Sequence, residues 1–178
     1  MNVLKIKRVI NCNDDLLDKV KSLYMISFPE DERRPWENIE EMISNQSPYF
    51  KINVATDEND NFIGFMTTWQ LPDTLYVEHF AVEQNLRGKG LGAEFFHSVT
   101  DGAENVVLEV ELPHSGEMAD RRISFYERNG LKAMKDFPYF QPPYRDDLQQ
   151  VPMMLMTKKT IEDPEFFVLM LHTLVYNQ

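Results

Sequence analysis

The segment 85–92, with the sequence NLRGKGLG, constrains the fold of this chain more than any other stretch. It holds three glycines and two cations, and it separates an apolar run at 75–82, which predicts a strand, from a run at 91–99, which predicts a helix. Glycine allows positive φ and close approach of a ligand to the backbone, and the first amides of a helix have no partners inside that helix. The helix dipole adds partial positive charge there. The segment therefore predicts an anion-binding turn suited to phosphate.

Two phosphate-binding patterns fit this turn poorly. A nucleotide P-loop ends in Gly-Lys-Ser/Thr because its hydroxyl must reach a magnesium ion, whereas Lys89 is followed by Gly90. The dinucleotide pattern G-x-G-x-x-G/A can be laid over residues 88–93, with Glu109 or Glu111 as the distant acid for a ribose. That fold needs repeated strand–helix–strand units, and the upstream residues predict hairpins instead. NAD binding is therefore the weaker interpretation.

A third pattern, R-x-x-G-x-G, is filled by Arg87, Gly90 and Gly92 directly after a strand. With this pattern the chain resembles the GNAT superfamily of acyl-coenzyme A dependent N-acyltransferases, whose coenzyme-binding signature is Q/R-x-x-G-x-G/A. The segment 123–131, ISFYERNGL, is similar to the family's FYxxxGF segment and stands where the family places it. The apolar run 106–110 between them looks like the strand that this fold splays away from its neighbour to admit the coenzyme. An ordinary solvated turn is the remaining alternative for the glycine segment.

Hydrophobic periodicity predicts the elements around these motifs. Strands are predicted at 1–10, 50–54, 62–69, 75–82, 105–111, 131–136 and 151–157. Helices are predicted at 16–24, capped by Asn13 or Asp14, at 36–43 behind Pro35, and at 91–102, 119–129 and 163–177. This order predicts a mixed α/β (α+β) fold: a mostly antiparallel, twisted sheet of about seven strands with helices on both faces. The resemblance implies the same fold, and we expect one domain over residues 1–178 with a coenzyme-binding core at about 50–157.

Two segments stand apart from this pattern. Residues 138–150 are too rich in proline for a regular strand and predict a long hairpin loop, which either lines a substrate site or covers a sheet edge. Residues 163–177 begin with Asp163, Pro164 and Glu165, which suit the cap and the acidic first turn of a helix. The broad apolar stripe of this helix either packs on the sheet or forms a homodimer surface.

Charge and composition exclude several classes of partner. The formal net charge is −11, whereas nucleic acids and anionic membranes select clustered Lys and Arg.

The single cysteine, Cys12, excludes an internal disulfide and fits a reducing compartment. The four histidines show no metal-ligand spacing, so we expect no metal. No targeting segment is visible, and the longest apolar run, 166–171, is too short to span a bilayer. We therefore expect a soluble, cytoplasmic protein.

Amide formation from a thioester requires a neutral amine, so a base must take a proton from an ammonium group whose pKa is about 8 to 10. Glu78 is the first candidate, because it lies on the strand that enters the anion-binding turn. His79 is adjacent and is expected on the opposite face of that strand, so only one of the two can serve. The resemblance implies that a backbone amide near Phe80 stabilises the tetrahedral intermediate and that Tyr126 protonates the departing thiolate.

The resemblance also assigns coenzyme contacts to the end of the strand and to the turn, at Phe80, Ala81, Val82, Arg87, Gly88, Lys89, Gly90, Leu91 and Gly92. The chain departs from the family just before the tyrosine segment, where Ala119 and Arg122 replace the ends of N-x-x-A. In the family this asparagine contacts the coenzyme; here Arg121 or Arg122 either reaches a phosphate instead or lies at the surface.

These motifs predict a GNAT-type N-acetyltransferase that moves an acetyl group from acetyl-CoA to an amine of a small molecule or peptide by direct attack. Two alternatives from other classes are a non-catalytic acyl-CoA-binding sensor and an NAD-binding enzyme. The presence of both Glu78 and Tyr126 favours catalysis. The sequence does not name the acceptor, although the acidic residues Glu78, Glu109 and Glu111 indicate an amine.

Overall fold

The computed structural model describes residues 4–177, so the first three residues of the predicted strand 1–10 lie outside the described part of the chain. The chain forms two compact units. The first unit runs to Gln70 and resumes at Val77–Gly102, and the second comprises Leu71–Tyr76 and continues from Ala103. The expectation of a single domain stays a prediction.

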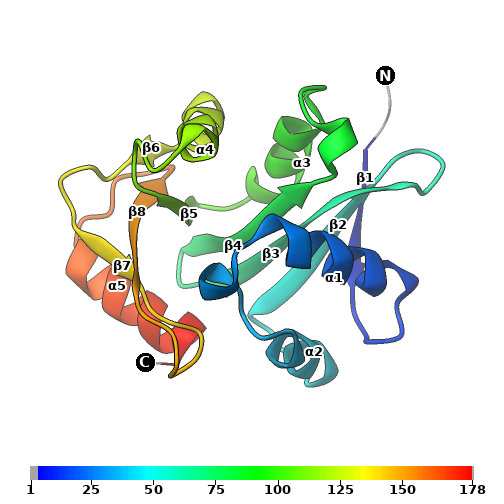
Figure 1. Ribbon diagram of the computed structural model, residues 1–178, viewed down its shortest axis with the longest axis horizontal. Helices are drawn as coiled ribbons and strands as arrows, with labels where there is room; N and C mark the ends of the chain where they lie inside the picture. The colour runs from blue at the N-terminus through cyan, green and yellow to red at the C-terminus, as the bar shows by residue number, and fades with distance from the viewer. Residues whose placement is uncertain (1–3, 178) are drawn as a thin grey trace. The chain divides into compact units, whose positions relative to one another are not determined.

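The first unit contains a sheet whose neighbouring strands follow the order β1-β2-β3-β4, together with helices (Figure 1). The strands are β1 (Lys5–Val9), β2 (Phe50–Thr56), β3 (Phe62–Leu71) and β4 (Thr74–Val82). Residues Leu71–Tyr76, where β3 ends and β4 begins, belong to the second unit. The helices are α1 (Asp15–Ser27), α2 (Trp36–Ser44) and α3 (Leu91–Thr100), with short 3-10 turns at η1 (Glu30–Glu32) and η2 (Gln84–Leu86). β1 and β3 each pair with β2 in the antiparallel sense.

Local sequence explains where the helices of the first unit begin and what they bury. The Asp14 carboxylate accepts a hydrogen bond from the Leu16 amide at 3.0 Å, which confirms one of the two predicted caps of α1. The buried ring of Tyr24 then packs against Phe65 of β3 at a centroid distance of 6.0 Å and against His79 of β4 at 4.8 Å. Helix α1 is thus fixed to the strands that lead toward the predicted coenzyme turn.

In the second unit, three strands pair with β8 (Val151–Thr157). Strands β5 (Asn105–Glu111), β6 (Lys132–Ala133) and β7 (Tyr139–Gln141) all pair with β8 in the antiparallel sense. The helices are α4 (Glu117–Arg128), α5 (Pro164–Leu171) and a π-helical turn, η3 (His172–Tyr176). The Asp163 carboxylate caps α5 by accepting from the Phe166 amide at 3.0 Å, which confirms the predicted start of this helix.

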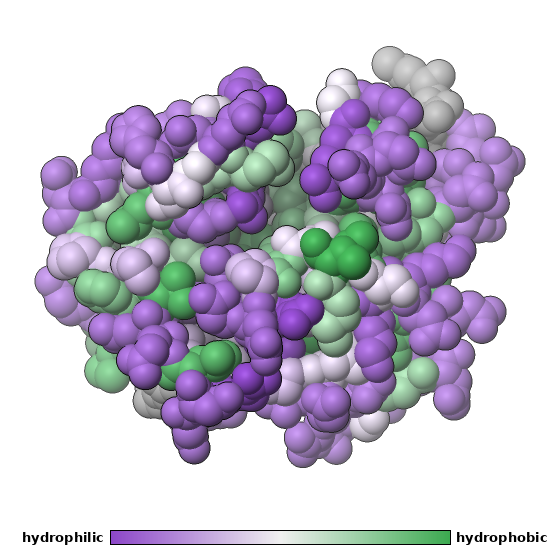
Figure 2. Space-filling model, viewed as in Figure 1, coloured by the Kyte–Doolittle hydropathy of each residue, from purple (hydrophilic) through white to green (hydrophobic). Residues whose placement is uncertain are grey.

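The predicted fold class is confirmed, and two details of the prediction were wrong. The described residues form eight strands, because the segment 138–150 contains β7 in place of an uninterrupted loop. Pro138 and Pro142 flank this strand, but Tyr139–Gln141 keep their amides and pair with Val151–Met153. The predicted strand 131–136 shrinks to the two residues of β6. The face drawn in Figure 2 is mostly hydrophilic, with separate hydrophobic areas, in keeping with the high charge of the chain.

Candidate active site

The predicted anion-binding turn joins β4 to α3 through η2. Gly88 and Gly90 take φ values of 77° and 83°, in the left-handed region that favours glycine, and Gly90 is the N-cap of α3. A Cβ atom built on either glycine would meet no heavy atom within 4 Å, so open space adjoins the backbone. The turn therefore has the two properties predicted for it, a conformation that needs glycine and access for a ligand at a helix N-terminus.

The other predicted coenzyme contacts differ in exposure. Arg87 is exposed, but its Nε donates a hydrogen bond to the carbonyl of Val82 at 2.9 Å, which ties the side chain to the end of β4. Lys89 is also exposed. The side chains of Ala81 and Val82 are buried, so a ligand would meet this part of β4 through its backbone.

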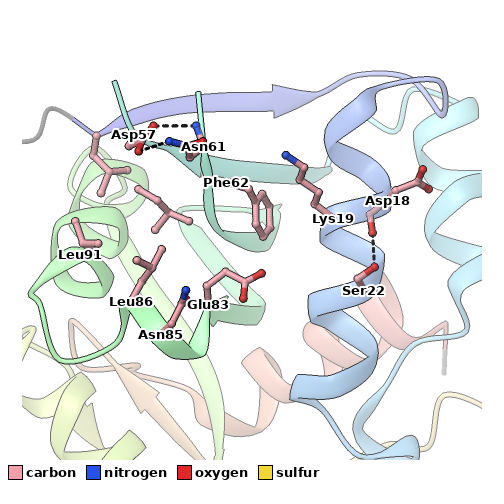
Figure 3. Close-up of a pocket in the computed structure, with 12 residues that line it drawn as sticks. Asp18, Lys19, Ser22, Asp57, Asn61, Phe62, Glu83, Asn85, Leu86 and Leu91 are labelled. Atoms are coloured by element: carbon pink, nitrogen blue, oxygen red, sulfur yellow. Dashed lines mark hydrogen bonds between the residues drawn. The ribbon is translucent and has the colours of Figure 1, made fainter. Parts of the chain in front are cut away.

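A cavity of about 650 Å³ lies within the first unit beside this turn (Figure 3). Glu83 and Leu86 come from the segment before α3, and Lys19 and Ser22 of α1 lie on the opposite wall. Asp57 also lines the cavity and is held in its own turn by the amides of Asn59 and Asn61 and by the Asn61 side chain. One lysine among carboxylates does not make the cluster of cations that phosphates favour, so phosphate contacts are expected from the backbone of the turn.

Glu78, the predicted base, is buried in an ion pair. Its side chain is 1% exposed, and Oε1 accepts from the Nε and Nη2 atoms of Arg34 at 2.9 and 2.6 Å. Oε2 accepts from Nε1 of Trp69 at 2.8 Å, and the Arg34 guanidinium lies 5.2 Å from the centroid of that indole ring. Hydrogen bonds between an arginine and a carboxylate are short and strong because both groups are charged. The Glu78 carboxylate is consequently held in one position.

This environment also fixes the charge of Glu78. Burial by itself would raise the pKa of Glu78, but the charge of Arg34 and the hydrogen bonds from His79 and Trp69 outweigh it and hold that pKa well below its usual range. Nδ1 of His79 lies 3.7 Å from Oε2, although the two side chains were expected on opposite faces of the strand. A carboxylate with so low a pKa is a weak proton acceptor.

Tyr126, the predicted acid, belongs to α4 in the second unit and is buried. Burial raises the pKa of its phenol, while the charge of Arg122 lowers that pKa and the charge of Glu111 raises it further. The net effect is a phenol that stays protonated at neutral pH. Nη2 of Arg122 donates to Oε1 of Glu111, which joins α4 to β5.

Arg34 governs the charge of Glu78, but nothing in the sequence marks it as a site residue. The two residues are 44 positions apart, and an arginine between a 3-10 turn and a helix carries no sequence signal of such a partner. The described residues contain no group of three or more His, Cys, Asp or Glu side chains arranged to hold a metal ion. Within the same residues, no helix has the length and hydropathy needed to cross a membrane.

Known proteins of one family match this chain over the segment that contains the glycine turn. Residues 17–131 match the model of the acetyltransferase (GNAT) family. This chain belongs to the GNAT acetyltransferase family. The family resemblance noted in the sequence is thereby confirmed, and the protein is an acyltransferase.

Solved structures extend the agreement to the whole chain. A protein from Bacteroides thetaiotaomicron, described as a GNAT-family acetyltransferase, is 32% identical, with a TM-score of 0.87 and coverage of 98% of this chain and 99% of the other. The ribosomal-protein-S18-alanine N-acetyltransferase of Escherichia coli is 17% identical, with a TM-score of 0.60 and coverage of 90% and 98%. A GNAT acetyltransferase from Elizabethkingia anophelis with acetyl-CoA bound is 16% identical, with a TM-score of 0.58 and coverage of 88% and 98%. The last two are similar in fold alone.

Proposed function

We propose that this GNAT protein transfers the acetyl group of acetyl-CoA to the amine of a small molecule or peptide by direct attack. The observation that carries the proposal is the turn before α3, where Gly88 and Gly90 adopt left-handed conformations beside open space. Amides at such a turn suit the pyrophosphate of a coenzyme. The fold is shared with a protein that has acetyl-CoA bound, which supports acetyl-CoA as the co-substrate.

The reaction breaks one bond and forms another. The acceptor ammonium loses a proton, its nitrogen attacks the thioester carbonyl, and a C–N bond forms. As the C–S bond of this intermediate breaks, the nitrogen loses a second proton, which ends on the released thiolate. In the proposed site, a backbone amide near Phe80 donates to the developing oxyanion. Tyr126 donates a hydrogen bond to the leaving sulfur, because burial keeps its phenol neutral and makes it a weaker acid than a free tyrosine.

Glu78 contributes in this proposal through its fixed negative charge. The pair with Arg34 and the bond from Trp69 keep the carboxylate ionised and in place, so it can favour a cationic acceptor without accepting the proton itself. A water molecule or another carboxylate then takes the proton. The pH dependence of a Glu78 variant separates this role from that of a direct base.

Calorimetry with acetyl-CoA tests the coenzyme site. Gly90→Val places a β-branched residue at a φ of 83° and fills the open space beside the turn, so we expect acetyl-CoA binding to be lost. Gly102→Val is the matched control, because Gly102 follows α3, also has open space around its Cβ position and lies outside the left-handed region. Unchanged affinity in Gly90→Val contradicts the proposed cradle.

Release of free thiol from acetyl-CoA tests the reaction itself. Lysine, spermidine, kanamycin and a tetrapeptide with a free amino terminus represent the main classes of amine. We expect at least one to release thiol and to gain the mass of one acetyl group. Tight binding of acetyl-CoA with no acetylated product from any class contradicts transfer to an amine and favours the sensor alternative.

A further inference from the structure

The cavity beside the coenzyme turn holds two charged side chains that no other described residue engages. Glu83, which follows β4, and Lys19 of α1 both line it, and Figure 3 shows them on opposite walls with the ring of Phe62 between them. Within residues 4–177, neither of the two charged side chains takes part in a hydrogen bond or an ion pair. The carboxylate and the ammonium thus face the same cavity without pairing with each other.

The other ionisable side chains of this cavity are occupied or point elsewhere. The Asp57 carboxylate accepts hydrogen bonds from the backbone amides of Asn59 and Asn61 at 2.9 and 2.8 Å, and from the side chain of Asn61 at 2.8 Å. Figure 3 shows the Asp18 carboxylate directed away from the cavity. One anion and one cation therefore remain for a molecule that enters it.

Apolar side chains form much of the remaining surface. Phe62, Leu86 and Leu91 line the cavity and are each partly exposed, and the buried Ile63 also lines it. The volume of about 650 Å³ falls within the range of about 300–1,000 Å³ that is usual for ligand sites, which combine an apolar lining with a few polar groups. A small molecule with an apolar body and charged groups complements such a cavity.

The two charges specify which groups the molecule must carry. Glu83 is partly buried, and a carboxylate loses hydration on burial that a cationic hydrogen-bond donor restores. Lys19 presents an ammonium with three donors, which suits a carboxylate. A molecule with both an ammonium and a carboxylate satisfies both walls at once, whereas a molecule with a single charge meets a like charge on one of them.

We propose that this cavity binds a small zwitterion with an apolar body, an amino acid or short peptide, with its ammonium at Glu83 and its carboxylate at Lys19. The site is separate from the glycine turn, whose backbone is expected to hold the coenzyme, so the zwitterion and acetyl-CoA bind together. The inference goes beyond the proposed acetyl transfer, and its test needs no turnover.

Calorimetry with leucine and with leucyl-leucine tests the site on the wild-type protein. We expect at least one of them to bind. Masking its ammonium by N-acetylation, or its carboxylate as the amide, removes a hydrogen bond between charged groups and should weaken binding by about 10- to 100-fold. This comparison changes the small molecule alone, so it does not depend on the folding of any variant.

Two variants assign each end of the molecule to its wall. In Glu83→Gln, N-acetylation should weaken binding by less than about threefold, because the anion that recognises the ammonium is gone, while amidation keeps its full effect. Lys19→Met should show the reverse. Glu94→Gln on α3 and Lys21→Met on α1 are matched controls, because Glu94 is exposed outside the cavity and Lys21 lies over the ring of Trp36.

Three outcomes overturn the inference. Absence of binding by both leucine and leucyl-leucine at millimolar concentration excludes a zwitterion site. Equal effects of masking in the wild type and in both cavity variants show that Glu83 and Lys19 are solvated charges and that binding occurs elsewhere. Displacement of the bound leucine or leucyl-leucine by acetyl-CoA assigns the cavity to the coenzyme.

Discussion

At the scale of single residues, Glu78 shows how its surroundings limit what a side chain can do. A carboxylate that accepts three hydrogen bonds from Arg34 and Trp69 has its pKa held low, so it stays charged throughout the working range of an enzyme. A direct base would instead need a pKa closer to the working pH. The geometry thus favours the fixed-charge role over the base role predicted from position in the chain.

The pH profile of Glu78→Gln distinguishes the two roles. If the charge acts without accepting a proton, the variant turns over more slowly than the wild type by a similar factor at every pH from 6 to 9. If Glu78 is the base, the variant recovers as pH rises and more acceptor is already neutral. Turnover of a saturating amine measured across this range decides between them, with calorimetry of acetyl-CoA as the check on binding.

Tyr126→Phe removes a proton donor and keeps the ring. Because the phenol is buried and neutral, we expect turnover to fall by roughly 10- to 1000-fold while the affinity for acetyl-CoA is nearly unchanged. Single-turnover rates and calorimetry measure the two quantities separately. Parallel loss of both would assign Tyr126 to packing.

At the scale of elements, the sequence predicted the features that are determined by residues close together along the chain, such as helix caps and turns. The caps Asp14 and Asp163 and the turn at Gly90 are local signals, and each lies where it was expected. Arg34, the ion-pair partner of Glu78, is 44 residues away in sequence, and only the folded chain brings the two together. Periodicity gives no information on such pairs, which explains why the elements were predicted better than the state of the candidate site.

The contact of β3 with the end of β4 depends on one glycine. A Cβ atom on Gly64 would lie 2.3 Å from the carbonyl oxygen of Ala81 and 3.0 Å from Cα of Val82, both backbone atoms. Gly64→Ala must therefore shift β4 where it enters the coenzyme turn. We expect a loss of about 1–3 kcal/mol in the free energy of unfolding, which lowers Tm by roughly 2–12 °C.

Calorimetry of the same variant links this contact to the site. A shifted β4 moves the backbone of residues 80–82, which the family resemblance assigns to the coenzyme, so the affinity for acetyl-CoA should fall as well. Gly102→Ala, at a position with open space, should change neither quantity. A Gly64→Ala protein with the wild-type Tm would show that β3 and β4 adjust without cost.

At the scale of the whole molecule, ionisable groups with shifted pKa values set how stability depends on pH. The pKa of Glu78 is lowered on folding, so its contribution is complete above the unfolded value of about 4.3 and is lost as pH falls through the folded value. Burial lowers the pKa of His172, so the stability that depends on its neutral form is complete above the unfolded value of about 6.5 and is lost as pH falls below it. Acid should therefore destabilise the protein through both groups.

Alkali should destabilise it through buried phenols. Burial raises the pKa values of Tyr24, Tyr126, Tyr139 and Tyr176, so each contributes fully below the unfolded value of about 10 and loses its contribution as pH rises toward the folded value. The slope reaches about 1.4 kcal/mol per pH unit for each group. The free energy of unfolding should thus be highest between about pH 7 and 9 and fall on both sides.

Urea unfolding of three variants from pH 3 to 11 tests this profile. Glu78→Gln leaves Arg34 buried without its anion, so it should lose about 3–5 kcal/mol at pH 7 and show a shallower decline in acid. Tyr139→Phe lacks one buried phenol, so its decline above pH 10 should be shallower than that of the wild type. Tyr49→Phe changes a tyrosine that is 60% exposed and should follow the wild-type curve throughout. A Glu78→Gln protein with the wild-type slope in acid would mean that other carboxylates dominate acid unfolding.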